Sequence, residues 1–136
     1  MDDEPITGQC LCGVVKFRIS GKFESFFLCH CARCRKGSGS AHSANLFSST
    51  ASLTWVSGAQ NVKTFRLSGG RHMRSFCADC GSALPLPQPE EGLLVVPAGS
   101  LESGIDRRPD AHICWASRAE WDTDLAAIET IDGLPG

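Results

Sequence analysis

The chain of 136 residues has the usual size of one domain with its own core, so we expect a single domain over residues 1–136. Thirteen basic and fifteen acidic residues give a net charge of −2 with no long run of either sign, which argues against a nucleic-acid or membrane-surface binder. The acidic start, Met1-Asp2-Asp3-Glu4, is unlike a signal peptide, and no apolar run is long enough to span a membrane.

The first half of the chain predicts short strands around a dense group of cysteines. Residues 15–19 alternate apolar and charged side chains, which is typical of a half-buried strand, and residues 8–13 are expected to continue or abut it. Residues 26–29 form a short apolar strand. Residues 33–40, rich in Gly, Ser and cations, predict a tight knuckle with one helical turn.

The second half continues this pattern without an amphipathic helix. Strands are predicted at residues 41–47, 53–56, 63–67, 93–96 and 112–116, and residues 72–76 lead into a second knuckle. Prolines at positions 85, 87 and 89 predict a loop or a sheet edge there. The sequence therefore predicts a mainly β fold of small twisted sheets.

Two outer pairs of cysteines predict one closed metal site. Without an export signal we expect a cytoplasmic protein, in which clustered cysteines bind metal more often than they form disulfides. If the chain is extended at Cys10 and Cys12, both thiols point to one face. Cys77 and Cys80 form a C-x-x-C knuckle followed by Gly81, which can adopt a positive φ. Four thiolates complete a structural zinc site; redox chemistry at the C-x-x-C, or a chance pair, is the alternative.

The central triplet of Cys29, Cys31 and Cys34 is an incomplete ligand set. Three thiolates can hold a second zinc and leave its fourth position open, which is the pattern of a catalytic or substrate-binding site. A thiol that coordinates there would lose its proton. The negative charge of such a site needs nearby cations, which are Arg33, Arg35 and Lys36.

Three alternatives to an open site remain at this point. The triplet could take His30, Cys114 or another side chain as a fourth ligand, it could pair instead with Cys77 and Cys80, or it could stay metal-free as a reactive thiol cluster. His30 would point away from Cys29 and Cys31 if the strand continues. Cys114 lies in an apolar run, which favours a buried small hydrophobe.

The remaining polar and aromatic residues predict ordinary structural roles. We expect histidines that pack or form hydrogen bonds, tryptophans in the core or at its rim, and solvated arginines, some of which an anionic substrate would need near the metal. These residues are His42, His72 and His112; Trp55, Trp115 and Trp121; and Arg71, Arg74, Arg107 and Arg108.

The cysteine motifs and the C-terminal region together resemble a known family. The ordered motifs G-x-C-x-C-G, C-H-C-x-x-C-R-K and F-C-x-x-C-G-S are similar to those of the glutathione-dependent formaldehyde-activating family, which shares its domain with centromere protein V. The supporting segments are residues 8–17, 29–36, 76–82, 97–101, 108–109, 112–113 and 117–121. The chain has Glu120 where the family commonly has proline before the tryptophan.

The resemblance implies a fold, two zinc ions and an activity. It implies a β-tent arrangement of antiparallel sheets stapled by zinc. The structural zinc would be held at positions matching Cys10, Cys12, Cys77 and Cys80, and the second zinc at positions matching Cys29, Cys31 and Cys34. The family's activity is the condensation of glutathione with formaldehyde to S-(hydroxymethyl)glutathione, or the reverse carbon–sulfur cleavage.

These expectations lead to two functional hypotheses. The first is a zinc-dependent carbon–sulfur lyase or synthase acting on a small-molecule thiol–carbonyl adduct, with His30 or His42 as candidate proton donors. In it, Arg33, Arg35 or Lys36 would hold a carboxylate of glutathione as co-substrate. The second is a non-catalytic, zinc-stabilised binding or chaperone-like module.

Overall fold

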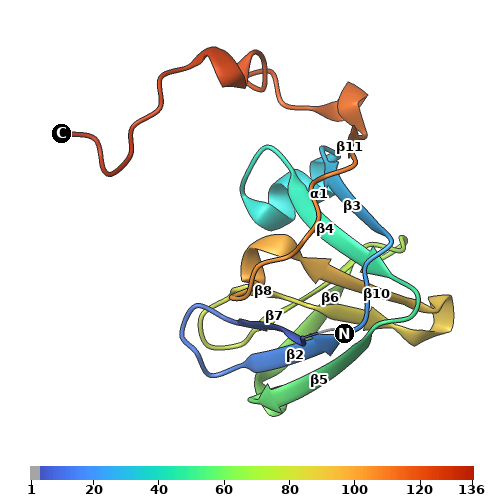
Figure 1. The fold of residues 1–136 in the computed structure, drawn as a ribbon. Coiled ribbons are helices and arrows are strands. Elements are labelled where there is room, and N and C mark those ends of the chain that lie inside the picture. The colour runs from blue at the N-terminus through green and yellow to red at the C-terminus, as the bar shows by residue number, and fades with distance from the viewer. Residues whose placement is uncertain (1–3) are drawn as a thin grey trace.

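The structure is a computed structural model that describes residues 4–136, so most of the acidic start, residues 1–3, lies outside the described residues. Residues 4–136 form eleven strands in three small sheets and one α-helix, which confirms the predicted mainly β fold (Figure 1). Five short 3-10 helices connect them: η1 (Ala59–Asn61), η2 (Pro89–Glu91), η3 (Ala98–Ser100), η4 (Trp115–Ser117) and η5 (Leu125–Ala127).

The first sheet has the strand order β1-β2-β5 and is antiparallel. Its strands are β1 (Ile6–Gln9), β2 (Lys16–Ser20) and β5 (Ser52–Ser57). The side chains of β2 alternate as predicted, with Phe17 and Ile19 buried. Of the two expectations for residues 8–13, that they abut this strand is confirmed for Gly8 and Gln9, and that they continue it was wrong, because the chain reverses after Cys10 and β1 pairs with β2 as a hairpin.

The second sheet has the order β11-β3-β4-β10-β9 and carries the central cysteines. Its strands are β3 (Ser25–Cys29), β4 (Ser43–Ser48), β9 (Leu86–Gln88), β10 (Leu93–Pro97) and β11 (Ala111–Ile113). The pairing of β11 with β3 is parallel, and the other pairings in this sheet are antiparallel. The proline-rich β9 lies at the sheet edge, as predicted, where a strand can lack amide donors.

The third sheet has the order β6-β7-β8 and carries the second knuckle. Its antiparallel strands are β6 (Val62–Arg66), β7 (Met73–Cys77) and β8 (Ala83–Leu84). The C-x-x-C knuckle forms the turn from β7 to β8.

The helix α1 (Ala32–Ser38) is longer than the single turn predicted from its Gly- and Ser-rich sequence. Cys31 caps it, since the Cys34 N–H donates to Cys31 Sγ at 3.4 Å, and Gly39 ends it in the left-handed conformation with φ 70°. The strand–cap–helix sequence therefore places the central cysteines on three successive local structures.

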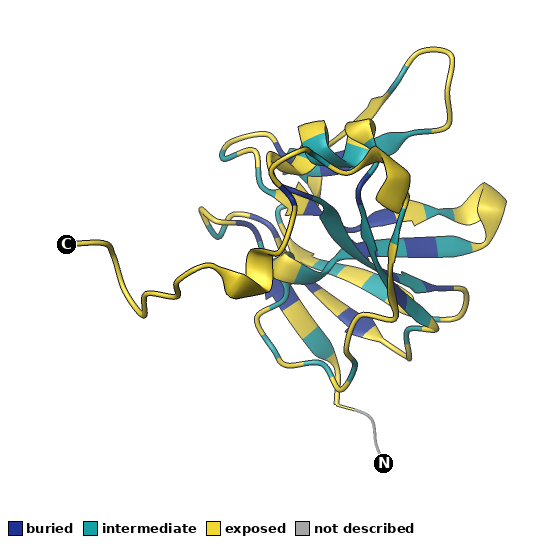
Figure 2. Cartoon of the chain, turned by 90° about the horizontal axis from the view of Figure 1, so that it is seen from above, coloured by how far each residue is buried: buried dark blue, intermediate teal, exposed yellow. Residues whose placement is uncertain are grey.

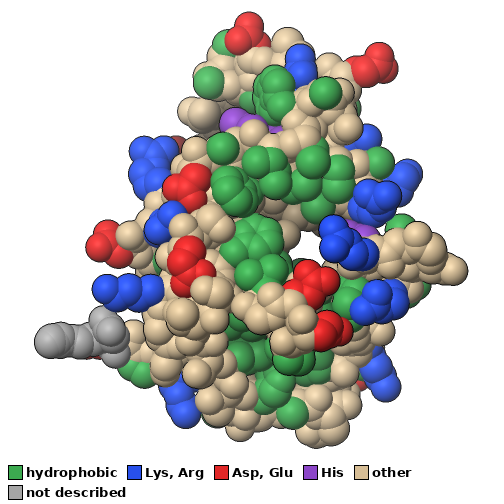
Figure 3. All heavy atoms as spheres, turned by 90° about the vertical axis from the view of Figure 1, so that its right-hand side faces the viewer, with side chains coloured by type: hydrophobic (Ala, Val, Ile, Leu, Met, Phe, Trp, Pro, Cys, Tyr) green, Lys and Arg blue, Asp and Glu red, His purple; other side chains and the backbone are tan. Residues whose placement is uncertain are grey.

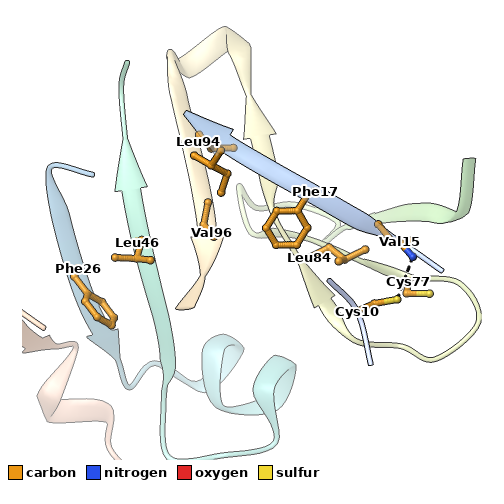
Figure 4. Close-up of a cluster of buried hydrophobic side chains, with 10 residues drawn as sticks. Cys10, Val15, Phe17, Phe26, Leu46, Cys77, Leu84, Leu94 and Val96 are labelled. Carbon is orange, nitrogen blue, oxygen red and sulfur yellow. Dashed lines mark hydrogen bonds between the residues drawn. The ribbon is translucent and has the colours of Figure 1, made fainter. Parts of the chain in front are cut away.

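The core lies where the three sheets meet. Buried side chains from different sheets face one another, and Cys10 and Cys77 close one end of this cluster (Figure 4). Gly8 is packed against the Phe17 ring and the Ser100 carbonyl, so a side chain there would collide with both. The first metal-binding group is thus continuous with the hydrophobic core.

The C-terminal segment, residues 114–136, differs from the rest of the chain. It extends away from the sheets, and nearly all of it is exposed, although Asp122 is buried (Figures 1 and 2). The strand predicted over residues 112–116 ends at Ile113, because Cys114 adopts φ 54° and starts η4.

The surface also carries hydrophobic side chains. Figure 3 shows a band of them across one face, with lysines and arginines mostly at its edges. In the part of the chain that the structure describes, no helix is long and apolar enough to cross a membrane.

Candidate functional site

The two outer cysteine pairs meet at the end of the core. The Sγ atoms of Cys10, Cys12, Cys77 and Cys80 all lie within 4.8 Å of one another. Sγ of Cys12 lies 3.6 Å from Sγ of Cys10 and 3.9 Å from Sγ of Cys77. A tetrahedral zinc with bonds of about 2.3 Å holds its sulfurs roughly 3.8 Å apart. The four thiols therefore fit zinc, and we call them the four-thiol group.

Two turns position the four-thiol group. Cys10 and Cys12 lie in the β1–β2 turn, so the turn and not an extended chain brings their thiols together. Gly81 adopts φ 76°, as expected for the residue after the knuckle, and its N–H donates to the Cys77 carbonyl at 2.8 Å.

Hydrogen bonds to sulfur favour the thiolate form of Cys10 and Cys80, whereas at Cys12 the Val14 amide is outweighed by burial and the neighbouring thiols, which raise the pKa to about 12. Val15 N–H donates to Cys10 Sγ at 3.3 Å, and Asn61 Nδ2 donates to Cys77 Sγ at 3.5 Å. The Ser82 hydroxyl lies 3.2 Å from Cys80 Sγ, and hydrogen bonding from Ser82 lowers the pKa of Cys80 to about 5. Zinc binds thiolates, so these bonds support metal binding.

Sequence reasoning missed the roles of Asn61 and Ser82. Ser82 also accepts a hydrogen bond from Leu11 N–H at 2.9 Å, so one hydroxyl connects the two turns of the four-thiol group. Its place directly after C-x-x-C-G was the available signal, since turn hydroxyls often bond to nearby groups. Asn61 precedes β6 and gave no such signal.

The central cysteines form a second, three-membered group, which we call the triplet. Cys29 ends β3, Cys31 caps α1 and Cys34 lies in its first turn, with all three Sγ atoms within 4.8 Å of one another. Among residues 4–136, no fourth Cys, His, Asp or Glu belongs to this group. Three thiols at this spacing fit a metal ion with a position left for a further ligand.

The thiols of the triplet differ in acidity. Burial raises the pKa of Cys29, as expected when a charged form loses water. Burial also raises the pKa of Cys31, but the Cys34 amide and the neighbouring thiols outweigh it, so the pKa of Cys31 lies below its ordinary value. A thiol is deprotonated when it coordinates a divalent metal, so metal binding would bring the three to the same charged state.

The side chains considered as a fourth ligand lie elsewhere. His30 faces away from the triplet and is buried, with Nε2 2.9 Å from His112 Nδ1 and Nδ1 3.0 Å from Asp122 Oδ2. Cys114 is exposed and belongs to neither group, so its predicted burial in a strand was wrong. Cys77 and Cys80 lie with Cys10 and Cys12 and not with the triplet.

Histidine and tryptophan rings surround His30. Its ring centroid lies 5.1 Å from that of His42, 5.0 Å from that of His112 and 4.9 Å from the Trp115 ring. The Arg118 guanidinium lies 4.5 Å from the centroid of the Trp115 ring. Packing and hydrogen bonding thus account for His112, as predicted.

Two other expectations about single residues need correction. Of the tryptophans predicted in the core or at its rim, Trp55 packs against the core beside Phe17 and Trp115 packs against the buried His30, whereas Trp121 is 62% exposed. Arg107 is not simply solvated, since it donates to the carbonyls of Phe23 and Glu24 and lies 3.0 Å from Asp110.

A pocket of about 190 Å³ adjoins the triplet, because Cys34 is part of its wall. We call it the Cys34 pocket. Its other lining residues are Arg33, Gly37, Ser38, His42, Ser43, Ala44, Asn45, His72, Met73, Arg74, Ser75, Ala83, Leu84, Leu86, Val95, Pro97 and Gly99. It lies between α1 and β4 on one side and β7, β8 and β10 on the other.

The three predicted anion-binding cations have different positions. Arg33 lines the Cys34 pocket. Arg35 is half-buried, and its Nε donates to the His30 carbonyl at 3.4 Å. Lys36 is exposed and does not line the pocket.

The comparisons with known proteins agree with the motifs. The family model described as glutathione-dependent formaldehyde-activating enzyme matches residues 5–117. A crystal structure of a Rhodobacter sphaeroides protein is similar over 78% of this chain and 98% of its own, with 23% identity and a TM-score of 0.57, which bears on the fold alone. No curated protein matches the chain. Because the family model spans most of its length, including both cysteine groups, the chain belongs to the glutathione-dependent formaldehyde-activating enzyme family.

Proposed function

We propose that this protein is a zinc-dependent carbon–sulfur lyase or synthase that acts on a thiol–carbonyl adduct and resembles S-(hydroxymethyl)glutathione synthase. The observation that carries the proposal is the position of Cys34, which belongs both to the three-thiol group and to the wall of a pocket. A reactant in the pocket would therefore lie beside the metal ligands.

The two cysteine groups would have separate roles. Cys10, Cys12, Cys77 and Cys80 would hold a closed structural zinc and join the first and third sheets. A zinc held by Cys29, Cys31 and Cys34 would supply a position at which a substrate thiol loses its proton.

The reaction forms one carbon–sulfur bond, opens one carbonyl π bond and transfers one proton to oxygen. The substrate thiolate attacks the carbonyl carbon, a carbon–sulfur bond forms, and the carbonyl π electrons move to oxygen, which takes a proton. His42 lines the Cys34 pocket and is our proposed donor. His30, the other predicted donor, is buried with both ring nitrogens close to other side chains. Cleavage of the adduct reverses these steps.

The cations beside the triplet would bind an anionic thiol such as glutathione. Arg33 is best placed to contact a carboxylate because it lines the Cys34 pocket. Arg35 would hold the backbone at His30, between two cysteines of the triplet, through its hydrogen bond to the His30 carbonyl. Lys36 would add positive charge at the surface. We further propose that residues 1–136 act as one cytoplasmic domain.

Replacement of Cys31 by Ser tests the proposal. We expect Cys31→Ser to bind one zinc where the wild type binds two, and to lose the acceleration of adduct formation between glutathione and formaldehyde over the uncatalysed rate. Cys114→Ser, at an exposed cysteine outside both groups, is the matched control and should behave as the wild type. A Cys31→Ser protein with full zinc content or full activity would overturn the assignment.

One observation favours the alternative of a non-catalytic binding module. The C-terminal segment exposes several large apolar side chains, which are Trp121, Ile128, Ile131 and Leu134. Exposed apolar surface can mark a protein-binding segment. A protein with two zinc ions that accelerates no thiol–carbonyl reaction would favour this second function.

A further inference from the structure

We propose that the Cys34 pocket binds the carbonyl partner, and that this partner is an aldehyde with an apolar body and a carboxylate, larger than formaldehyde. The inference rests on the proposed function for its chemistry, and on the size, walls and charge of the pocket for the class of ligand.

The size of the pocket exceeds what formaldehyde requires. The pocket measures about 190 Å³. An apolar cavity of about 150 Å³ in another protein holds a molecule as large as benzene. Formaldehyde has two non-hydrogen atoms and would leave most of the space unfilled. The volume therefore matches an aldehyde with an aromatic ring or a short branched chain.

One side of the pocket is apolar and belongs to the core. Its apolar lining residues are Ala44, Met73, Ala83, Leu84, Leu86, Val95 and Pro97. Leu84 is 1% and Leu86 7% exposed, so packing fixes this wall before any ligand binds. Binding of an apolar ligand against this wall is favoured by about 25 cal/mol for each Å² of apolar surface that it removes from water.

Cationic side chains line the other side. Arg33 comes from α1, and His72 and Arg74 come from the β7 region. All three side chains line the Cys34 pocket, and burial and the charges of Arg33 and Arg74 lower the pKa of His72. Within residues 4–136, neither arginine forms an ion pair, and Arg74 lies 5.2 Å from the Phe76 ring centroid. A carboxylate would supply the missing anionic partner.

Glutathione itself suits this pocket poorly. It carries two carboxylates, an ammonium group and two amides, and each needs a polar partner when buried. Two hydroxyls of the lining are already engaged, since Ser43 donates to the Cys34 carbonyl at 3.1 Å and Ser75 bonds to Thr64 at 3.1 Å. The thiol would therefore approach the triplet from outside the pocket, where the exposed Arg33 can contact its carboxylate, and the pocket would hold the aldehyde beside Arg74. The sulfur of the thiol attacks the aldehyde carbon and the carbonyl oxygen takes a proton. The product is a hemithioacetal, and the step needs no oxidant.

Binding of two unreactive probes tests the ligand class without requiring turnover. Phenylbutyrate has an apolar body and a carboxylate, and phenylbutanol replaces the carboxylate by a hydroxyl. We expect calorimetric titration of the zinc-loaded chain to show phenylbutyrate binding at least about tenfold more tightly than phenylbutanol, as one charge-assisted hydrogen bond allows. In Arg74→Leu the two probes should bind alike.

A pocket-filling variant and a matched control locate the binding. Ala83 is exposed and lines the pocket, so Ala83→Trp should fill the space and abolish binding of both probes. Ala59 is also exposed but does not line the pocket, so Ala59→Trp should bind both probes like the wild type. No binding to the wild type, or unchanged binding to Ala83→Trp, would overturn the inference.

A turnover experiment separates this inference from the proposed function. With glutathione, we expect a higher kcat/KM for para-formylbenzoate than for formaldehyde, and Ala83→Trp should lose only the former. If phenylbutyrate binds in the pocket but no aldehyde reacts, the proposed function fails while the ligand class stands. If formaldehyde alone reacts and the probes do not bind, the function stands and the inference fails.

Discussion

The imidazole of His30 and the carboxylate of Asp122 meet in the interior, with Nδ1 3.0 Å from Oδ2 and the two side chains 1% and 7% exposed. His30 lies between two cysteines of the triplet, and Asp122 belongs to the otherwise exposed C-terminal segment. The contact therefore holds this segment beside the candidate metal site.

Removal of Asp122 should destabilise the protein. In Asp122→Ala, His30 Nδ1 stays buried without its partner, so we expect the free energy of unfolding to fall by about 1–3 kcal/mol. Urea denaturation measures this change. Asp132→Ala, in the exposed part of the same segment, should stay within about 0.5 kcal/mol of the wild type. Equal stability of the two variants would show that the His30–Asp122 contact contributes nothing.

The four-thiol group should matter more for stability than the triplet. Cys77 is fully buried against the core, so Cys77→Ser should lose one zinc and lower Tm by about 10 °C or more, since structural zinc contributes several kcal/mol to folding. In a graded titration with a chelator, the zinc of the triplet should leave first. A Cys77→Ser protein that melts at the wild-type temperature would contradict this role.

Glu24 should make stability depend on acidic pH. Hydrogen bonds from Ser49, whose N–H lies 2.6 Å from Oε1, and then from the Ser48 and Thr50 hydroxyls lower the pKa of Glu24. A lowered pKa in the folded state gives stability that is present above the unfolded pKa of about 4.3 and is lost as pH falls through the folded pKa.

Comparison with a glutamine variant measures this contribution. Thermal melts between roughly pH 3 and 6 should show a steeper loss of stability for the wild type than for Glu24→Gln. Glu90→Gln changes an exposed carboxylate on η2 and should keep the wild-type slope. Parallel curves for wild type and Glu24→Gln would mean that these hydrogen bonds do not stabilise the folded state.

Leu46 should be the most sensitive position in the core of the second sheet. It is fully buried on β4 between neighbouring strands, and Leu46→Ala should lower the free energy of unfolding by about 2–5 kcal/mol. Leu134→Ala, at a side chain that is 91% exposed, is the control and should leave stability unchanged. A loss below about 1 kcal/mol at Leu46 would show that the core relaxes to fill the space.

The sequence predicted the strands and the cysteine motifs well because both depend on local spacing. Alternation of side chains is enough to identify β2, and the C-x-x-C-G pattern is enough to predict the positive φ of Gly81. The extended geometry expected at Cys10 and Cys12 was wrong, since the same spacing also occurs in a hairpin turn. The ligand roles of the seven grouped cysteines stay predictions until metal is measured.

Long-range contacts explain what the sequence could not predict. The helix α1 is capped by a cysteine, a residue type that is not a usual cap, so its length was underestimated. The burial of Asp122 depends on His30, far away in the chain, and no periodic pattern indicates it. The Cys34 pocket likewise combines residues of two sheets and a helix.

The spacing of the cysteines also orders their assembly during synthesis. The triplet lies within six positions, 29–34, so a nascent chain can bind its metal as soon as this stretch leaves the ribosome. The four-thiol group stays incomplete over the 68 positions from Cys12 to Cys80, which take about 3–14 s to translate. During that time Cys10 and Cys12 are a bare dithiol, open to oxidation and to soft metals such as copper. If the four-thiol group holds zinc, that zinc can bind to all four thiolates only after Cys80 has been synthesised.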